Sequence, residues 1–229
     1  MWLFNKKYPV DFNGFKDCHS HILPGVDDGV QKIEDSLLIL KEYERMGISE
    51  VVFTPHIMED VPNTPSDLRK RFAAFKEAYH GPISLHLAAE YMIDHHFEEL
   101  LASGDLLTHG EGNHILVETS YFNRPSDMDR ILFDLQSEGY EPILAHPERY
   151  MYMDLEEYGK LKDKGILFQM NLASLSGMYG THVKQRAEYL MKNGHYDMAG
   201  SDIHRISMIQ AYKAIRLKNG QSLPMPEHI

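Results

Sequence analysis

The sequence contains a single cysteine, Cys18, among its 229 residues. One cysteine cannot form an internal disulfide, and it excludes the cysteine-rich sites that hold structural zinc. A catalytic cysteine in a phosphatase needs an arginine-containing loop that cradles the phosphate, whereas Cys18 is followed by HSHILPG. We therefore expect Cys18 to be a buried structural thiol.

Long apolar runs and basic clusters are also scarce. No stretch approaches the ~20 apolar residues that span a membrane, and the N-terminal MWLFNKKYPVDFNGFKD lacks the apolar core and cleavage site of a signal peptide. The formal net charge is −11, and the basic residues gather only at 69–71. Such a chain repels nucleic acid unless bound cations invert the local field. The sequence predicts a cytoplasmic protein with neither membrane insertion nor nucleic-acid binding, and it leaves the oligomeric state open.

Short apolar runs alternate with amphipathic segments along most of the chain. The runs lie at about residues 15–19, 50–55, 83–89, 114–118, 142–146, 166–171 and 197–201. Three intervening segments have helical spacing of apolar residues, and their expected N-terminal boundaries are Ser66, Ser126 and Thr181. This alternation predicts an α/β fold of parallel strands joined by crossover helices. We expect an N-terminal extension at 1–14, one domain at 15–217 and a loose tail at 218–229.

Two architectures fit this pattern, an open doubly wound sheet and a closed barrel. An open sheet of the nucleotide-binding type needs a glycine-rich turn after its first strand, whereas the first apolar run leads into DCHSHILPGVDDG. A barrel places its active site on the loops at the carboxyl ends of its strands. The barrel therefore predicts chemically active side chains at those ends.

Side chains able to bind metal follow six of the seven apolar runs. They are His19, His21, His56, Glu90, Glu118, His146, Asp202 and His204. The sixth run ends instead in Asn171, which offers a hydrogen bond. One histidine at a strand end is more often structural than a ligand. Several carboxylates that converge, however, repel one another unless cations neutralise them, so the joint pattern predicts a metal site.

The first motif indicates what this site contains. His19 and His21 are two residues apart on a strand and therefore point to the same side, and the LPG turn would bring Asp27 or Asp28 back to them. Mixed nitrogen and oxygen ligands without thiolate suit manganese, iron or zinc. So many ligands indicate more than one ion, with a carboxylate such as Glu90 shared between ions. Paired ions clamp a phosphoryl group and activate water.

Two arginines lie close to predicted ligands in the sequence. Arg149 follows His146 within AHPERY, and Arg205 directly follows His204. A guanidinium beside a metal cluster suits two-pronged binding of phosphate, whereas a salt bridge at the rim is the alternative role for each. The residues thus predict a metal-dependent phosphoesterase with Glu90, Arg149 and Arg205 as catalytic residues.

The motifs DCHSHILPGVDDG, TPH, AAEY, LVE, LAHPERY and GSDIH together resemble the polymerase and histidinol phosphatase (PHP) superfamily. Over residues 15–205 the sequence is most similar to the manganese-dependent protein-tyrosine phosphatases of bacterial capsule and exopolysaccharide loci. The resemblance implies a distorted (β/α)7 barrel with three metal ions at the C-terminal ends of the strands, manganese being favoured over iron or zinc. It implies Glu90 as the bridging carboxylate and, as the full ligand set, His19, His21, Asp28, His56, Glu90, Glu118, His146, Asp202 and His204.

The resemblance also implies a substrate, the phosphotyrosine-containing C-terminal tail of a bacterial tyrosine kinase of polysaccharide synthesis. Arg149 matches a phosphate-contacting arginine of that family. A second family arginine lies a few residues beyond the closing histidine, where this chain has only Arg205 nearby and the segment ISMIQ departs from the pattern.

Two alternatives remain open at this point. One is a small-molecule phosphatase of the histidinol-phosphate type, and the other is a non-catalytic metal-binding or polymerase-accessory module. An open, partly apolar pocket mouth would favour a protein substrate. The candidates to line such a mouth are Tyr91, Tyr121, Phe122, Tyr150 and Tyr152.

Overall fold

The computed structural model describes residues 6–110 and 112–226, in which strands alternate with helices. The strands are β1 (Lys7–Pro9), β2 (Lys16–Ser20), β3 (Glu50–Phe53), β4 (His56–Ile57), β5 (Ser84–Leu87), β6 (Glu90–Met92), β7 (His114–Glu118), β8 (Glu141–Ala145), β9 (Leu167–Asn171), β10 (Met198–Gly200) and β11 (Arg216–Lys218). The helices are α1 (Ile33–Met46), α2 (Pro65–Ala78), α3 (His95–Ser103), α4 (Met128–Ser137), α5 (Leu155–Asp163), α6 (Leu172–Ser176), α7 (Thr181–Lys192) and α8 (Ile209–Lys213), with 3₁₀ turns η2 (Pro147–Arg149) and η3 (Ile206–Met208). Every expected apolar run overlaps a strand, so the α/β class is confirmed.

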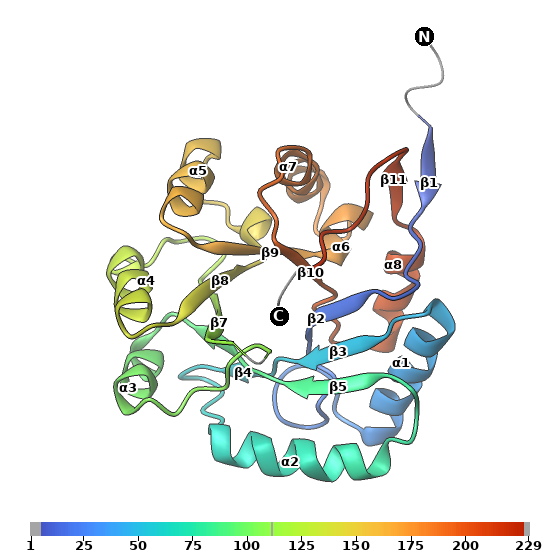
Figure 1. Cartoon of the computed structure of the whole chain (residues 1–229), viewed down its shortest axis with the longest axis horizontal. Helices are drawn as coiled ribbons and strands as arrows, with labels where there is room; N and C mark the ends of the chain where they lie inside the picture. The colour runs from blue at the N-terminus through green and yellow to red at the C-terminus, as the bar shows by residue number, and fades with distance from the viewer. Residues whose placement is uncertain (1–5, 111, 227–229) are drawn as a thin grey trace.

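Nine of the strands form two parallel sheets whose edges approach each other. One sheet has the order β4-β6-β7-β8-β9-β10 and the other has the order β2-β3-β5. Ser20, at the end of β2, forms a parallel bridge to Ile203, just beyond β10. Figure 1 shows these strands curled around a common centre, with helices α1 to α5 and α7 on the outside. Because the strands are parallel, the curl brings their carboxyl ends to one rim.

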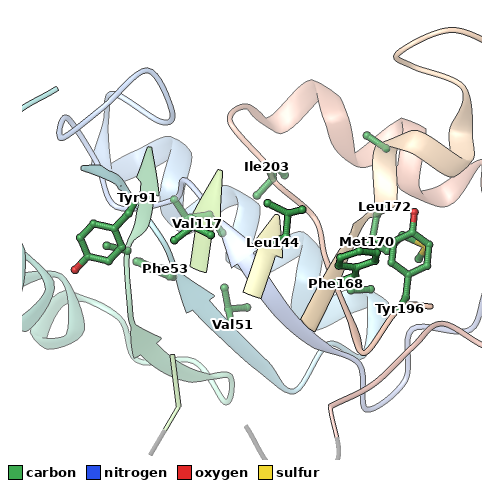
Figure 2. Close-up of a cluster of buried hydrophobic side chains, with 14 of the residues drawn as sticks. Val51, Phe53, Tyr91, Val117, Leu144, Phe168, Met170, Leu172, Tyr196 and Ile203 are labelled. Atoms are coloured by element: carbon green, nitrogen blue, oxygen red, sulfur yellow. The ribbon is translucent and has the colours of Figure 1, made fainter. Parts of the chain in front are cut away.

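Alternate residues of the strands face two different apolar layers. In β7, Ile115 and Val117 belong to the main core between the strands and the helices, part of which is drawn in Figure 2. Leu116 belongs to a second cluster, whose members are Cys18, Leu116, Ile143, Ala145 and Met198. These residues come from four strands and therefore lie inside the curl. Cys18 is thus the buried thiol that the sequence predicts, and burial raises the pKa of this thiol well above its usual range.

The three expected helices are present, but their N-terminal boundaries differ from the prediction. The N-caps are Thr64, Asp127 and Gly180 rather than Ser66, Ser126 and Thr181. Helix α2 begins earlier because Pro65 occupies its first turn, where proline is favoured, and the Thr64 side chain accepts from the Asp67 amide. Within the described residues, no helix has the length and apolar character needed to cross a membrane.

The two ends of the described chain pair with each other. Strands β1 and β11 form an antiparallel two-stranded sheet in which Tyr8 lies opposite Leu217. Parts of the expected extension and tail therefore pair with each other beside the curled sheet. Leu223, which lies in the expected tail, is buried. Residues 1–5 and 227–229, at the outer ends of these two segments, lie outside the described residues. The division at 15–217 stays a prediction.

Gly200, the last residue of β10, tests how tightly β10 packs against β2. A Cβ atom added here would lie 2.3 Å from the His19 Cβ and 2.9 Å from its amide nitrogen. We expect Gly200→Ala to lower the free energy of unfolding by about 1–3 kcal/mol, measured by chemical denaturation. In the control Gly159→Ala, inside α5, the added Cβ meets nothing within 4 Å, so this change should stabilise by about 0.5–1 kcal/mol. Equal stability of the two variants would contradict close packing at Gly200.

Candidate metal centre

Two histidines at the end of β2 face each other. The Nε2 atoms of His19 and His21 are 3.0 Å apart, so both side chains point to the same side, as their spacing predicts. The register between β2 and β3 shifts between Asp17 and Ser20, and an irregularity of this kind re-aims side chains. Both rings are buried, so their nitrogen atoms depend on partners within the protein.

Each of the two imidazoles is fixed on its far side by an acceptor. His19 Nδ1 lies 2.6 Å from Gln169 Oε1, and His21 Nδ1 lies 2.8 Å from Asp27 Oδ2. The Gln169 amide nitrogen donates to the Cys18 carbonyl oxygen, which leaves the amide oxygen facing His19. Both Nδ1 atoms therefore donate a proton, and in the neutral rings the two Nε2 lone pairs point at each other.

This arrangement of His19 and His21 fits a metal ion. Two lone pairs at a separation of 3.0 Å repel each other unless a cation or a proton lies at them. Metal-ligating histidines characteristically donate their other ring nitrogen to a carboxylate or carbonyl oxygen, which fixes the tautomer. Gln169 and Asp27 make these two contacts here. The donor set and its supporting hydrogen bonds therefore fit a metal site.

Glu90, the first residue of β6, lies at the centre of the cluster. Its Oε2 is 3.2 Å from His19 Nε2 and 3.3 Å from His21 Nε2. The same oxygen lies 3.2 Å from His56 Nδ1, and Oε1 lies 3.0 Å from His146 Nε2. One carboxylate thus faces four imidazoles, which is the position expected of a carboxylate shared between ions.

Two further carboxylates lie close to Glu90. Asp202 Oδ1 is 3.4 Å from His21 Nε2, and Glu118 Oε1 is 3.3 Å from His56 Nδ1. All three carboxylates are buried. Burial, together with the charges of Glu90 and Asp202, raises the pKa of Glu118 well above its usual range. Keeping all three ionised is therefore costly for the protein alone, and bound cations would offset that cost.

Three overlapping groups of side chains hold their potential ligand atoms within 4.8 Å of one another. The first is His21, Asp28, His56 and His204, the second is His19, His21, Glu90 and Asp202, and the third is His56, Glu90 and Glu118. His146 lies beside these groups, and its Nε2 atom is 3.0 Å from Glu90 Oε1 and 3.7 Å from Glu118 Oε2. All nine residues that the sequence predicts as ligands therefore come together in one cluster.

The two aspartates of the DDG motif have different surroundings. The Asp27 side chain is buried and accepts hydrogen bonds from His21 Nδ1 and from the His56 amide. The Asp28 side chain is 72% exposed, and its Oδ1 lies 3.5 Å from His56 Nε2 and 3.4 Å from His204 Nε2. Asp27 thus orients His21, whereas Asp28 faces the open side of the cluster. The geometry favours Asp28 as a ligand, a choice that the sequence left open.

The backbone is strained at two of the clustered residues. His146 and Asp202 are the non-glycine residues of positive φ in the described ranges, at 35° and 53°. Such conformations cost about 1–3 kcal/mol each and persist where the surroundings enforce them. The Asn171 side chain donates to Asp202 Oδ2 at 2.7 Å, as expected from its place at the end of the sixth run. Strain and hydrogen bonding thus fix the direction of the Asp202 carboxylate.

A pocket of about 600 Å³ opens above the cluster, and both predicted arginines line it. Arg149 is largely buried, and its Nη1 donates to Asp202 Oδ2 at 2.8 Å. Arg205 is exposed. Tyr121 and Phe122 line the pocket as predicted, and so do Met178 and Tyr179, which the sequence did not indicate.

The other aromatic residues expected at the pocket mouth are not there. Tyr91 and Tyr150 were wrong predictions, because both are fully buried. Their hydroxyls accept from the amides of Leu107 and Thr119, so each ring packs inward from its strand end. Tyr152 does not line the pocket either, since its hydroxyl is hydrogen-bonded to Thr119 Oγ1. Tyr150 and Tyr152 thus contact the pocket residue Thr119 from behind, whereas Tyr91 packs in the main core.

Sequence reasoning also missed residues that support the cluster from behind. The buried Asp17 carboxylate accepts from the amides of Ser201, at 2.6 Å, and His19, at 3.3 Å, and so ties β10 to β2. Gln169 orients His19 and lies two residues before Asn171 on the same strand. The sequence did hold a signal for Gln169, because it lies on the same face of its strand as Asn171. For Asp17, a carboxylate within a buried strand was the corresponding signal.

Comparisons with known proteins agree with this site. The family model for capsular polysaccharide synthesis, CpsB/CapC, matches residues 15–222. The tyrosine-protein phosphatase YwqE of Bacillus subtilis is 31% identical over 198 residues, which are 83% of this chain and 77% of the relative. The tyrosine-protein phosphatase CpsB of Streptococcus pneumoniae is 28% identical over 225 residues, covering 89% of this chain and 90% of the relative.

Solved structures give the same grouping. One solved structure comes from the crystallographic work on YwqE of Bacillus subtilis and CpsB of Streptococcus pneumoniae, which are described as unique metal-dependent tyrosine phosphatases. It superposes on this chain with a TM-score of 0.78 at 28% sequence identity. The superposition covers 87% of this chain and 84% of the solved chain. A phosphotriesterase homology protein from Escherichia coli, at 14% identity and a TM-score of 0.53, covers 89% of this chain and 87% of its own and shares the fold alone. The family match spans all nine clustered residues and the strands that carry them, and the chain belongs to the CpsB/CapC family of capsular polysaccharide synthesis.

Proposed function

We propose that this chain is a metal-dependent protein-tyrosine phosphatase, which hydrolyses phosphotyrosine in a protein substrate. The observation that carries the proposal is the cluster around Glu90, where imidazole nitrogens and carboxylate oxygens converge beneath an open pocket. Relatives named as tyrosine phosphatases share most of the chain. The substrate that the family suggests is the phosphotyrosine tail of a bacterial kinase of polysaccharide synthesis.

The nine clustered side chains would hold two or three transition-metal ions. Manganese is the proposed metal, and the same imidazole and carboxylate ligands also suit iron and zinc. When bound, such ions neutralise the carboxylates and supply Lewis-acid activation of water. Glu90 would be the shared carboxylate because it faces four histidines, and Asp28 rather than Asp27 would complete the ligand set.

The two arginines of the pocket are the proposed phosphate-binding groups. Arg149 reaches the cluster from the turn after β8 and is held by Asp202. Its remaining N–H groups can donate to phosphate oxygens, and the planar guanidinium suits two-pronged contact. Arg205 is exposed beside the same pocket, where it would meet the substrate as it enters.

The pocket mouth favours a phosphotyrosine side chain over a small polar ester such as histidinol phosphate. Phe122 and Met178 line the pocket and are 74% and 44% exposed. Exposed apolar side chains beside a polar site are typical of surfaces that recognise apolar groups. An aromatic ring that carries phosphate fits such a mouth. A non-catalytic module would not be expected to retain all nine ligand positions together with both arginines.

We also propose that the curled sheet is a distorted (β/α)7 barrel. Two residues separate β3 from β4, and two separate β5 from β6, so each pair can be read as one interrupted strand. Read in this way, seven parallel strands follow one another in chain order. The Asp202 amide donates to the His19 carbonyl oxygen at 2.8 Å, which places the last strand beside the first. The cytoplasmic location and the domain at 15–217 remain predictions.

The proposed function is tested by measuring phosphate release from three substrates, a phosphotyrosine peptide, a phosphoserine peptide and histidinol phosphate. We expect manganese-dependent turnover of the phosphotyrosine peptide, which chelation abolishes and added manganese restores. Elemental analysis of protein purified without chelator should find at least two equivalents of transition metal. Preference for histidinol phosphate, or activity that survives chelation, would contradict the proposal.

Glu90→Gln removes the central charge but keeps the shape of the side chain. We expect metal content to fall and turnover to drop by at least about 100-fold, the upper end of what the loss of a group supporting a ligand costs. Circular dichroism should show an intact fold. Glu99→Gln is the control, since Glu99 is 65% exposed on α3, and it should change neither quantity. Substantial turnover at saturating manganese would remove Glu90 from the bridging role.

Phe122→Ala tests whether the pocket mouth contacts the substrate beyond the phosphate. We expect kcat/KM on a phosphotyrosine peptide to fall by about 5- to 30-fold, equivalent to about 1–2 kcal/mol of lost apolar contact. Turnover of glycerol phosphate, which lacks the ring, should not change. Phe133→Ala is the matched control, because Phe133 is 66% exposed on α4 and does not line the pocket. Equal losses on both substrates would mean that Phe122 supports the pocket instead of contacting the ring.

A further inference from the structure

Arg149 lies over two tyrosine rings that come from different loops. Its Cζ atom is 4.2 Å from the ring centroid of Tyr121, in the loop after β7. The same atom is 4.2 Å from the ring centroid of Tyr179, in the loop between α6 and α7. Both separations lie well within the ~6 Å range over which a guanidinium is attracted to an aromatic face. Three loops therefore meet at this one side chain.

The two rings are themselves held in place. Tyr121 stacks on the buried Tyr150 ring, with centroids 6.2 Å apart. The Tyr179 hydroxyl lies 3.4 Å from Asn171 Nδ2, the amide that also donates to Asp202. The Arg149 side chain is 16% exposed. The attraction to the rings is consequently little weakened by water, and the rings cannot easily move away.

Contact with ring faces differs from a salt bridge because it leaves the N–H donors of the guanidinium free. A ring face attracts the guanidinium plane but accepts none of its in-plane N–H groups, whereas a carboxylate partner occupies donors and neutralises the charge. Arg149 gives one N–H to Asp202. The two ring faces take up none of the remaining N–H groups, which stay available to donate to another partner. A rigid plane with free donors is what two-pronged phosphate contact requires.

We propose that Tyr121 and Tyr179 are positioning residues that hold the guanidinium of Arg149 in the orientation that binds the substrate phosphate. The inference rests on the proposed function for its substrate, and it assigns to the two tyrosines a role that acts only through Arg149. Removing either ring lets the guanidinium rotate about its long side chain, and phosphate binding then requires it to be ordered again.

The test uses Tyr121→Leu and Tyr179→Leu in the full-length, manganese-loaded protein, with inorganic phosphate as the probe. Isothermal titration calorimetry should show about 3- to 30-fold weaker phosphate binding for each leucine variant, the range expected for one desolvated cation–π contact. Tyr121→Phe and Tyr179→Phe keep the ring and should stay within about twofold of the wild type. Tyr189→Leu is the control, since Tyr189 lies on α7 and does not line this pocket, and it should not change affinity.

A double-mutant cycle separates positioning from general support of the fold. In an Arg149→Ala background, either leucine substitution should weaken phosphate binding no further, because the group that the rings position is gone. Metal content and thermal stability should match those of the single Arg149→Ala variant. Additive losses in that background, or loss of metal in the leucine variants alone, would overturn the proposal.

Failure of this inference can be told apart from failure of the proposed function. If the wild type binds phosphate through Arg149 and the rings but does not hydrolyse a phosphotyrosine peptide, the proposed function fails and the positioning role stands. If it hydrolyses the peptide and the leucine variants bind phosphate as tightly as the wild type, the positioning role fails and the proposed function stands.

Discussion

Repulsion between buried carboxylates is the constraint on which the rest of this molecule depends. Burial opposes the ionised form of Glu90, Glu118 and Asp202 alike. The facing histidines nevertheless hold the pKa of Glu90 and of Asp202 below the usual range, whereas the pKa of Glu118 is raised by burial and by its two charged neighbours. Without added cations, the protein therefore favours the ionised form of Glu90 and Asp202 and the protonated form of Glu118. Added cations would allow all of them to be ionised together.

A cluster that repels itself keeps its shape only if the backbone around it is firmly held. Gly200 and Gly29 approach the strand end that carries the paired histidines, and Cβ atoms there would lie 2.3 Å from His19 Cβ and 2.4 Å from the His21 carbonyl oxygen. The left-handed backbone of Asp202 adds strain at the same place. These close approaches leave the backbone beneath the clustered side chains little freedom to move.

The clustering of these candidate metal ligands was predictable because it follows from topology. Parallel strands place all their carboxyl ends on one rim, so the chain positions of His19, Glu90 and His146 were enough to bring them together. The supporting residues depend instead on side-chain direction between elements that no local pattern connects. Gln169 reaches His19 across the curl, and Tyr179 reaches Arg149 from a loop with no apolar periodicity. Tyr150 failed as a prediction for the same reason, since a position after a strand end does not determine whether a ring faces inward.

The charge of the site also affects what it binds. Five carboxylates surround the base of the pocket, and they are Asp27, Asp28, Glu90, Glu118 and Asp202. The arginines Arg149 and Arg205 line the same pocket and are opposite in charge to these carboxylates, and the whole chain has a formal net charge of −11. A phosphate monoester carries close to two negative charges near neutral pH, so ionised carboxylates beneath the pocket oppose its binding. Two or three divalent cations would invert the local field. Cations held by the clustered ligands would therefore favour the binding of a phosphate ester in this pocket.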